Sequence, residues 1–329
     1  MISLTNAGTF ICGHPKSGTS LLMALLDFHP QVIVYPEETG FFRWFAHQTE
    51  GLSVEEKIRR AEELILHIFH WDPENPHPSQ AGFADRDYTD ISFDQVRTAY
   101  HRKIDEFGRS IPNILPAAIF AYGEVTGQSS LRTLRWVEKT PYNELFADKV
   151  FDLWSEARCI QTIRDPRDNY ASYRRKHPEW TPEIFAFSWR ASTHRGWSNR
   201  KQYGESRYLV IRYEDLVNDL ETTLKTVRDF LGIEDHPTLR EPSRKGISWG
   251  GNSMFGECFR GVSANPIGRY RTALDRDSIQ RLEAALYPEM RRLDYPLDES
   301  ISLRARMQWF DFRLRRAIGG SARGFLSVD

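Results

Sequence analysis

The sequence predicts an α/β fold in which a mainly parallel β-sheet is flanked by helices. Three observations predict it. Short apolar segments rich in β-branched and aromatic residues recur along the chain, helical patterns of period 3.6 lie between them, and a glycine-containing turn joins the first segment to a helix. We expect the 329 residues to form a single domain, with a helical and loop insertion around residues 43–130 and a helical tail around residues 299–325.

Four segments have the composition of buried parallel strands. They are residues 9–12 (TFIC), 134–137 (LRWV), 159–163 (CIQTI) and 208–211 (YLVI). Each is followed by polar residues, glycine or proline, as is typical where a strand ends. Because such a sheet binds ligands at the carboxyl ends of its strands, the residues after these segments are candidates for a functional site.

Two helices are the clearest. Ser53 and Glu56 form a capping box, and an apolar stripe follows at Val54, Ile58, Ala61, Ile65 and Ile68. A second helix is predicted after Asp215 and should end at Gly232. Its apolar positions are Leu216, Leu220, Leu224, Val227, Phe230 and Leu231.

The composition excludes several classes of protein. Lys and Arg number 44 against 45 Asp and Glu, and the net charge of -1 disfavours a nucleic-acid-binding protein. The three cysteines lie far apart, without the spacing of a disulfide framework or a zinc site, and are expected to be reduced thiols. With no apolar run of about 18 residues and no signal-like N-terminus, the sequence predicts a cytoplasmic protein.

The turn after the first predicted strand has the features of a phosphate-binding loop. Residues 13–20 read GHPKSGTS and lead into an apolar helix, so backbone N–H groups and a helix N-terminus would surround one anion. Lys16 adds a positive charge, and Ser17, Thr19 and Ser20 add hydroxyl donors. In the loop of P-loop kinases the lysine follows the second glycine, where this chain has Thr19, so a Mg²⁺-dependent kinase is a disfavoured alternative. An ordinary glycine turn is the other alternative.

Residues 15–22 (PKSGTSLL) resemble the phosphosulfate-binding loop of sulfotransferases that use 3′-phosphoadenosine 5′-phosphosulfate (PAPS). Residues 36–42 (PEETGFF) are similar to the acidic segment of carbohydrate and tyrosylprotein sulfotransferases. The resemblance implies the P-loop-like sulfotransferase fold, PAPS as sulfate donor, adenosine 3′,5′-bisphosphate (PAP) as product, and no metal. It assigns nucleotide binding to residues of the loop, namely Lys16, Ser17, Gly18, Thr19 and Ser20.

A second segment carries the resemblance further. Residues 164–173 (RDPRDNYASY) match the family pattern in which Arg164 and Ser172 bind the 3′-phosphate of PAPS. If residues 164–166 (RDP) were the only match to the family, pairing of Arg164 with Asp165 or Asp168 on a surface turn would be the better interpretation. Residues 213–216 (YEDL) resemble a structural signature of the family, with acidic residues that cap the helix that follows.

Two candidates remain for the loop that closes over the nucleotide. Arg260 and Gly261 resemble that loop in family members and would contact the 3′-phosphate. Residues 244–246 (RKG) are a competing match.

The resemblance also implies the catalytic residues. Glu38 lies three residues before a Phe-Phe pair, as the family's general base does, and Glu37 is the fallback. Lys16 would reach the oxygen that bridges phosphate and sulfate, and Lys139 resembles the lysine of the family's K-[TD]-P segment that helps bind sulfate. Pairing of Lys139 with Glu138 is disfavoured because neighbours on a strand point to opposite faces.

A histidine base, as in the small-molecule sulfotransferases, is an open alternative. The candidates are His14, His29, His67 and His70. Of these, His67 and His70 are expected at the end of the Ser53 helix, and His29 is expected to be structural.

The acceptor is expected to be a hydroxyl compound: a carbohydrate, a phenol or a lipid-linked glycan. Residues 43–130 and 177–207, which are rich in aromatic residues, would form its pocket. The tail over residues 303–325 alternates arginine with apolar and aromatic residues. This tail is expected either to pack on the enzyme's own surface or to lie at a membrane surface. The second possibility motivates the remaining alternative for the function, a non-catalytic nucleotide-binding or membrane-peripheral module.

Overall fold

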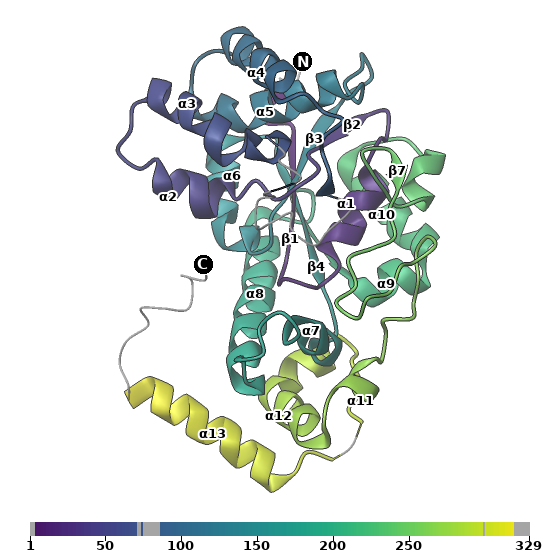
Figure 1. Ribbon diagram of the computed structural model, residues 1–329. Helices are drawn as coiled ribbons and strands as arrows, with labels where there is room; N and C mark the ends of the chain where they lie inside the picture. Colours follow the sequence, from purple (N-terminus) through teal and green to yellow (C-terminus); the bar gives the residue numbers. More distant parts are fainter. Residues whose placement is uncertain (1–3, 71–73, 75–85, 299, 319–329) are drawn as a thin grey trace. The chain divides into compact units, whose positions relative to one another are not determined.

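The computed structural model describes residues 4–70, 74, 86–298 and 300–318 (Figure 1). Its centre is a parallel sheet with the strand order β2-β3-β1-β4-β5, five strands in the described part of the chain. The strands are β1 (Gly8–Cys12), β2 (Val32–Val34), β3 (Arg135–Lys139), β4 (Arg158–Ile163) and β5 (Tyr208–Arg212). The predicted α/β class and all four predicted strands are confirmed. The short edge strand β2 was not predicted.

The chain divides into two compact units. The first consists of Met1–Ile163 and Ser192–Ala264 and holds the whole sheet. The second consists of Arg164–Ala191 and Asn265–Asp329. The single domain expected from the sequence stays a prediction.

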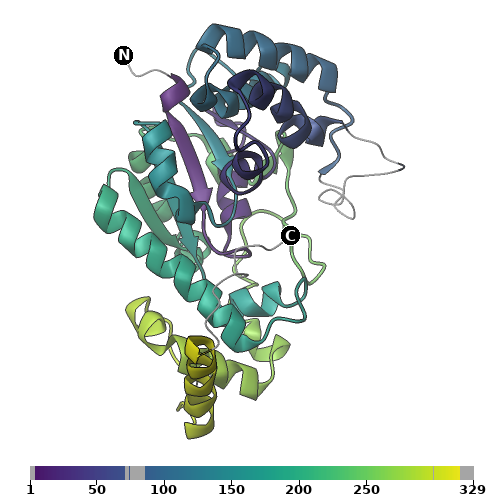
Figure 2. The ribbon, with the colours of Figure 1, turned by 90° about the vertical axis from the view of Figure 1, so that its left-hand side faces the viewer.

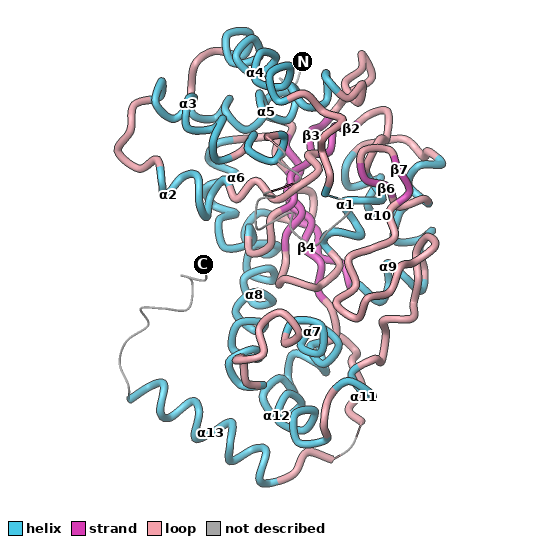
Figure 3. Tube along the Cα trace, in the orientation of Figure 1, coloured by secondary structure: helices cyan, strands magenta, loops and turns pink. Residues whose placement is uncertain are grey.

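Each face of the sheet buries its own apolar layer within the first unit. Phe10 and Trp136 lie in one layer, whereas their chain neighbours Ile11 and Val137 lie in the other, as the alternation of a pleated strand requires. Figure 3 distinguishes the strands from the helices that contribute to these layers. The first layer includes residues of α3 (Val54–Leu64), α4 (Phe93–Phe107), α5 (Ile111–Val125) and α6 (Ala147–Leu153). The second includes residues of α1 (Thr19–Leu26), α9 (Tyr213–Asn218) and α10 (Leu220–Leu231).

Helices α4 and α5 belong to the region that the sequence predicts as an insertion, and they lie side by side (Figures 1 and 2). Helix α5 also packs on the sheet. At Gly123 the approach is so close that a Cβ atom would lie 2.6 Å from Cγ2 of Ile33 in β2. Residues 111–125 therefore form part of the core of the first unit and are not a peripheral insertion.

The predicted helix ends are partly confirmed. The capping box at Ser53 and Glu56 is present, but α3 ends at Leu64 and a 3₁₀ helix, η3 (Leu66–Phe69), follows. The single helix expected after Asp215 is two helices, because the side chain of Asp219 accepts from the Thr222 amide and starts α10 anew. Gly232 caps α10 in the left-handed region, at φ 66°.

The remaining elements are short or lie in the second unit. In the first unit they are the 3₁₀ helices η1 (Leu4–Asn6), η5 (Asn143–Phe146) and η6 (Pro237–Arg240), the π-helix η2 (Phe41–Phe45), α2 (Ala46–Gln48), and the antiparallel pair β6 (Ser243–Arg244) and β7 (Ile247–Ser248). The second unit contains α7 (Pro166–Tyr173), α11 (Tyr270–Ala273), α12 (Arg276–Arg292) and α13 (Leu303–Ile318). Helix α8 (Pro182–Tyr203) has residues in both.

Helix α13 confirms a helix within the predicted tail, whose residues 299 and 319–325 lie outside the described range. Among the helices that the structure describes, none is long and apolar enough to cross a membrane.

Candidate active site

Three adjacent strands deliver their following segments to one edge of the sheet. In the parallel register of β1 and β3, Ile11 lies beside Lys139, so both strands end at the same level. The amide of Tyr142, after β3, donates to the carbonyl of Gly13, after β1, at 3.1 Å. The amide of Gly40, after β2, donates to the hydroxyl of Thr140 at 3.1 Å. These bonds bring the predicted loop, Glu38 and Lys139 into one part of the first unit.

The predicted phosphate loop has the backbone of an anion site. Lys16 is in the left-handed region at φ 68°, and Gly18 is the N-cap of α1 at φ 100°. Gly18 has no side chain with which to cap this helix, and the first amides of α1 point from a positive helix end toward the loop. Left-handed residues among right-handed ones turn successive N–H groups to one side, which makes a concave anion-binding nest.

Both glycines of the loop are required by close contacts. A Cβ atom at Gly13 would lie 2.4 Å from the carbonyl oxygen of Thr162, and one at Gly18 would lie 2.5 Å from Cδ2 of Tyr213. The hydroxyl of Ser17 lies 2.9 Å from that of Thr162 and is buried. The Ser17 side chain thus fastens the loop to β4, and the Ser17 backbone amide donates to the carbonyl of His14 at 3.2 Å.

The hydroxyls at the start of α1 differ in their surroundings. Thr19 is buried, whereas Ser20 is half-buried and its hydroxyl lies 3.4 Å from Nδ2 of Asn252. Lys16 is half-buried beside them. Their contacts with a nucleotide stay predictions.

Glu38 and Lys139 form an ion pair at the end of β3. The Nζ atom of Lys139 lies 2.6 Å from Oε1 of Glu38, and the lysine side chain is 3% exposed against 34% for the glutamate. Glu138 points the other way, where it accepts from the hydroxyls of Thr39 and Thr140 and from the side-chain Nδ2 of Asn143. The expected separation of Glu138 from Lys139 on opposite faces is confirmed by these bonds.

Glu37 has a different environment from Glu38. Its Oε1 accepts from the Tyr88 hydroxyl and from Nη1 of Arg244, each at 2.9 Å, and lies 3.3 Å from Nε of Arg86. The Glu37 side chain is 7% exposed. This carboxylate therefore joins three segments of the fold.

The two candidates for the nucleotide-closing loop also differ. In residues 244–246, Arg244 ends β6, while Lys245 and Gly246 at φ 54° and 72° are the two central residues of the hairpin turn to β7. Lys245 bonds to Asp90 at 2.7 Å. The R-K-G match is thus a β-hairpin with engaged side chains. Arg260 and Gly261 lie exposed on a loop.

Glu144 is a site residue that sequence reasoning missed. It is fully buried in η5, and its Oε2 accepts from the Gly13 amide at 2.9 Å while its Oε1 accepts from the Ser192 hydroxyl. Burial raises the pKa of Glu144 to about 7, and burial does the same for the pKa of Glu138. Glu144 and Gly13 are 131 positions apart, so no local pattern could have joined them.

The histidines have mostly structural contacts. His29 accepts from the Gln31 amide through Nδ1, and its Nε2 lies 3.1 Å from the carbonyl oxygen of Glu234. His67 lies within η3 and His70 is its C-cap, as expected for helix-end residues. His14 is buried in the phosphate loop, with Nδ1 3.0 Å from the Pro15 carbonyl oxygen.

In the second unit, Arg164 directly follows β4 and donates from Nη2 to the carbonyl of Pro266 at 3.0 Å. Asp165 pairs with Arg167 at 2.7 Å, and Asp168 accepts the backbone amides of Gly268 and Tyr270. Ser172 is buried in the last turn of α7. Binding of a 3′-phosphate by Arg164 and Ser172 stays a prediction.

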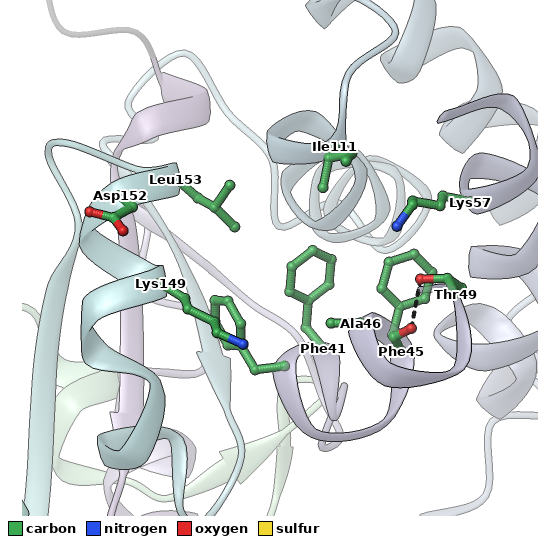
Figure 4. Close-up of a pocket in the computed structure, with 10 residues that line it drawn as sticks. Phe41, Phe45, Ala46, Thr49, Lys57, Ile111, Lys149, Asp152 and Leu153 are labelled. Atoms are coloured by element: carbon green, nitrogen blue, oxygen red, sulfur yellow. Dashed lines mark hydrogen bonds between the residues drawn. The ribbon is translucent and has the colours of Figure 1, made fainter. Parts of the chain in front are cut away.

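A cavity of about 270 Å³ lies beside the segment that follows Glu38 (Figure 4). The rings of Phe41 and Phe45 in η2 line it together with Leu153 of α6, and Lys57 and Lys149 lie at its sides. An apolar lining with a few polar groups is typical of a small-molecule pocket.

Comparison with known proteins identifies the family. A sequence model of the sulfotransferase family matches residues 9–237. The chain belongs to this family. Carbohydrate sulfotransferase 2 of mouse and of human is 34% identical over 92 residues, which is 28% of this chain and only 17% of each relative.

Solved structures of sulfotransferase domains are similar to this chain. The sulfotransferase domain from the curacin biosynthetic pathway superposes with a TM-score of 0.54 at 18% identity, covering 88% of this chain and 98% of that one. The corresponding domain of the Synechococcus PCC 7002 olefin synthase has a TM-score of 0.48 at 20% identity, covering 93% and 94%. At this level of identity the first similarity shows a common fold.

The donor set of the loop fits a phosphosulfate. Backbone amides at the start of α1, the charge of Lys16 and the buried lysine at the end of β3 are all groups that stabilise an anion. Across the described ranges, no group of three or more His, Cys, Asp or Glu side chains is arranged to hold a metal ion.

Proposed function

We propose that this sulfotransferase transfers the sulfuryl group of PAPS to a hydroxyl acceptor by in-line displacement, with Glu38 as the general base. The ion pair of Glu38 and Lys139 carries the proposal, because it lies at the end of β3, beside the strand that leads into the phosphate loop. A carboxylate and two lysines are the groups that the reaction needs, since a proton leaves the acceptor and negative charge develops on the leaving phosphate.

Glu38 takes the proton from the acceptor hydroxyl. PAPS supplies the sulfuryl group when bound, so that the new bond from acceptor oxygen to sulfur forms as the bond from sulfur to the phosphate oxygen breaks. Lys139 holds the Glu38 carboxylate in one orientation through its 2.6 Å contact and offers its charge to the sulfate oxygens. Lys16 offsets charge on the bridging oxygen. The engagement of Glu37 with Arg244 and Tyr88 supports Glu38 as the base.

The nucleotide contacts proposed here rest on the match to the family's patterns. The loop amides, with Ser17, Gly18, Thr19 and Ser20, would hold the 5′-phosphate. Arg164 and Ser172 would bind the 3′-phosphate. Because residues 244–246 form a β-hairpin turn, Arg260 and Gly261 are the better match for a second contact to the 3′-phosphate.

The acceptor is proposed to carry an apolar group next to its hydroxyl. The support is the cavity between η2 and α6, whose aromatic rings suit a hydrocarbon or aromatic group better than a fully hydroxylated sugar. Among the expected acceptors this favours phenols and lipid-linked compounds.

The test is a turnover assay with the purified 329-residue chain. PAPS labelled in its sulfuryl group is offered with a panel of phenols, amphiphilic alcohols and sugars, and both labelled product and PAP are measured. We expect label transfer to at least one apolar hydroxyl compound, together with a thermal shift on addition of PAP. No transfer with any acceptor and no thermal shift would overturn the proposal, and Mg²⁺-dependent ATP hydrolysis would replace it with the kinase alternative.

A further inference from the structure

Helix α13 has two apolar faces, and its own unit covers one of them. Ala305 is buried, Trp309 lies under the guanidinium of Arg190 at 5.1 Å, and Phe312 stacks on Trp309 at 5.6 Å. Arg316 lies 3.5 Å from the ring centre of Phe187. These positions follow one another at helical spacing, so by this face α13 contacts Phe187 and Arg190 of α8. Helix α13 also packs against α12.

A second apolar stripe runs along the opposite face. It consists of Leu303, Met307, Phe310 and Leu314, with exposed fractions of 73%, 62%, 67% and 46%. The steps of four, three and four residues keep all four side chains within an arc of about 60° at about 100° per residue. They make up four of the ten large exposed hydrophobic residues among those described, although α13 is a small part of the chain. A contiguous exposed stripe of this kind marks an interaction surface.

Arginines border the stripe on both sides. Arg304 and Arg315 fall on one side of it at this helical spacing, and Arg306 and Arg313 fall on the other. With Arg316 the helix has five arginines against a single acid, Asp311, which gives it a charge of +4 in a chain whose total is -1. Asp311 is itself paired with Arg315 at 2.8 Å.

We propose that α13 docks this stripe on an anionic lipid bilayer. An apolar row between two arginine rows matches an interface in which hydrocarbon lies below a layer of negative headgroups. The long arginine side chains can reach up to the headgroups while the row of Leu, Met and Phe enters the acyl region. Two copies meeting through the same stripe would bring arginine rows against each other, which opposes self-association.

The surface would hold the enzyme beside lipid, where amphiphilic hydroxyl compounds concentrate. Docking requires neither nucleotide nor turnover, so it can be tested independently of sulfuryl transfer. A sulfotransferase that fails to dock and a docking protein that fails to transfer sulfate are distinct results.

The experiment is co-sedimentation of the whole chain with vesicles of phosphatidylcholine alone and of phosphatidylcholine mixed equally with phosphatidylglycerol. We expect binding to the mixed vesicles that weakens as salt is raised, and little binding to the neutral ones. Arg306→Gln combined with Arg313→Gln should weaken binding about 30-fold, the effect of removing two charges from a negative surface. Met307→Ser combined with Phe310→Ser should weaken it about tenfold or more.

Two control variants give the measurement its specificity. Leu131→Ser removes an apolar side chain of the first unit that is 108% exposed, and Arg60→Gln removes an arginine of α3. Both variants should bind the vesicles as the wild type does. Equal binding to neutral vesicles, or equal losses in the control variants, would overturn the proposal. So would a chain that ignores vesicles but dimerises in analytical ultracentrifugation and becomes monomeric with Met307→Ser and Phe310→Ser, since the stripe would then be a protein interface.

Discussion

Replacing Glu144 with glutamine removes a buried titratable group from beneath the phosphate loop while keeping an oxygen for the Gly13 amide. Glu144 is 0% exposed, and its carboxylate is held by the Gly13 amide and the Ser192 hydroxyl. The glutamine oxygen can accept from Gly13, and the Ser192 hydroxyl can rotate to accept from the new NH₂ group. The variant should therefore keep the fold and lose only the titration.

The magnitude follows from the pKa. Burial raises the pKa of Glu144 from 4.5 to about 7. Between these pH values the folded protein keeps a proton that the unfolded chain has released, so rising pH favours the unfolded state. At about 1.4 kcal/mol per pH unit, the wild type loses about 3 kcal/mol of unfolding free energy through Glu144 between pH 4.5 and 7. This loss of unfolding free energy is complete above pH 7, and Glu144→Gln does not undergo it.

The assay is urea unfolding followed by tryptophan fluorescence at a series of pH values from 5 to 8. Relative to the wild type, Glu144→Gln should gain about 3 kcal/mol of unfolding free energy across that range. Glu63→Gln on α3 is the control, because a side chain that is 63% exposed changes its surroundings little on unfolding. Parallel stability profiles for the wild type and Glu144→Gln would refute the reasoning.

Two further variants probe the nucleotide contacts. Gly18→Ala should lose about 1–3 kcal/mol of unfolding free energy and bind PAP more weakly, because its Cβ would lie 2.5 Å from the Tyr213 ring at φ 100°. Gly51→Ala is the control, since Gly51 also has a positive φ but a Cβ atom there would have no described atom within 4 Å. An equally large loss of stability in Gly51→Ala would show that the contact with Tyr213 is not the cause. Arg164→Ala should weaken PAP binding about 10- to 100-fold in calorimetry through the lost charged hydrogen bonds, and an unchanged affinity would remove Arg164 from the nucleotide site.

The sequence was sufficient to predict the sheet framework and the phosphate loop because both depend on local patterns. Strands with consecutive apolar residues, and a glycine turn between a strand and a helix, are recognisable within about ten residues. Strand β2 was not predicted because its three residues are too few to show a pattern. The break between α9 and α10 was not predicted because a single side-chain cap at Asp219 overrides a continuous apolar stripe.

Contacts between distant segments could not be predicted in the same way. Lys139 and Glu38 are 101 positions apart, and only the resemblance to sulfotransferases selected both. Glu144 and Thr162 had no such pattern, although they bind the phosphate loop from 131 and 145 positions away. The competing match at residues 244–246 looked equal in sequence, and its difference lies in the hairpin that pairs Arg244 with Glu37.

The most direct test of Glu38 as the base compares Glu38→Gln with Glu37→Gln under saturating PAPS. Both substitutions remove one negative charge from neighbouring residues, but Glu38 contacts Lys139, whereas Glu37 contacts Arg244 and Tyr88. We predict that Glu38→Gln lowers kcat by a factor of about 10²–10⁴ and leaves PAP affinity within about twofold, as expected when only proton removal is lost. Glu37→Gln should lower the melting temperature and keep most of the turnover of each folded molecule. Near wild-type turnover in Glu38→Gln would contradict the central claim.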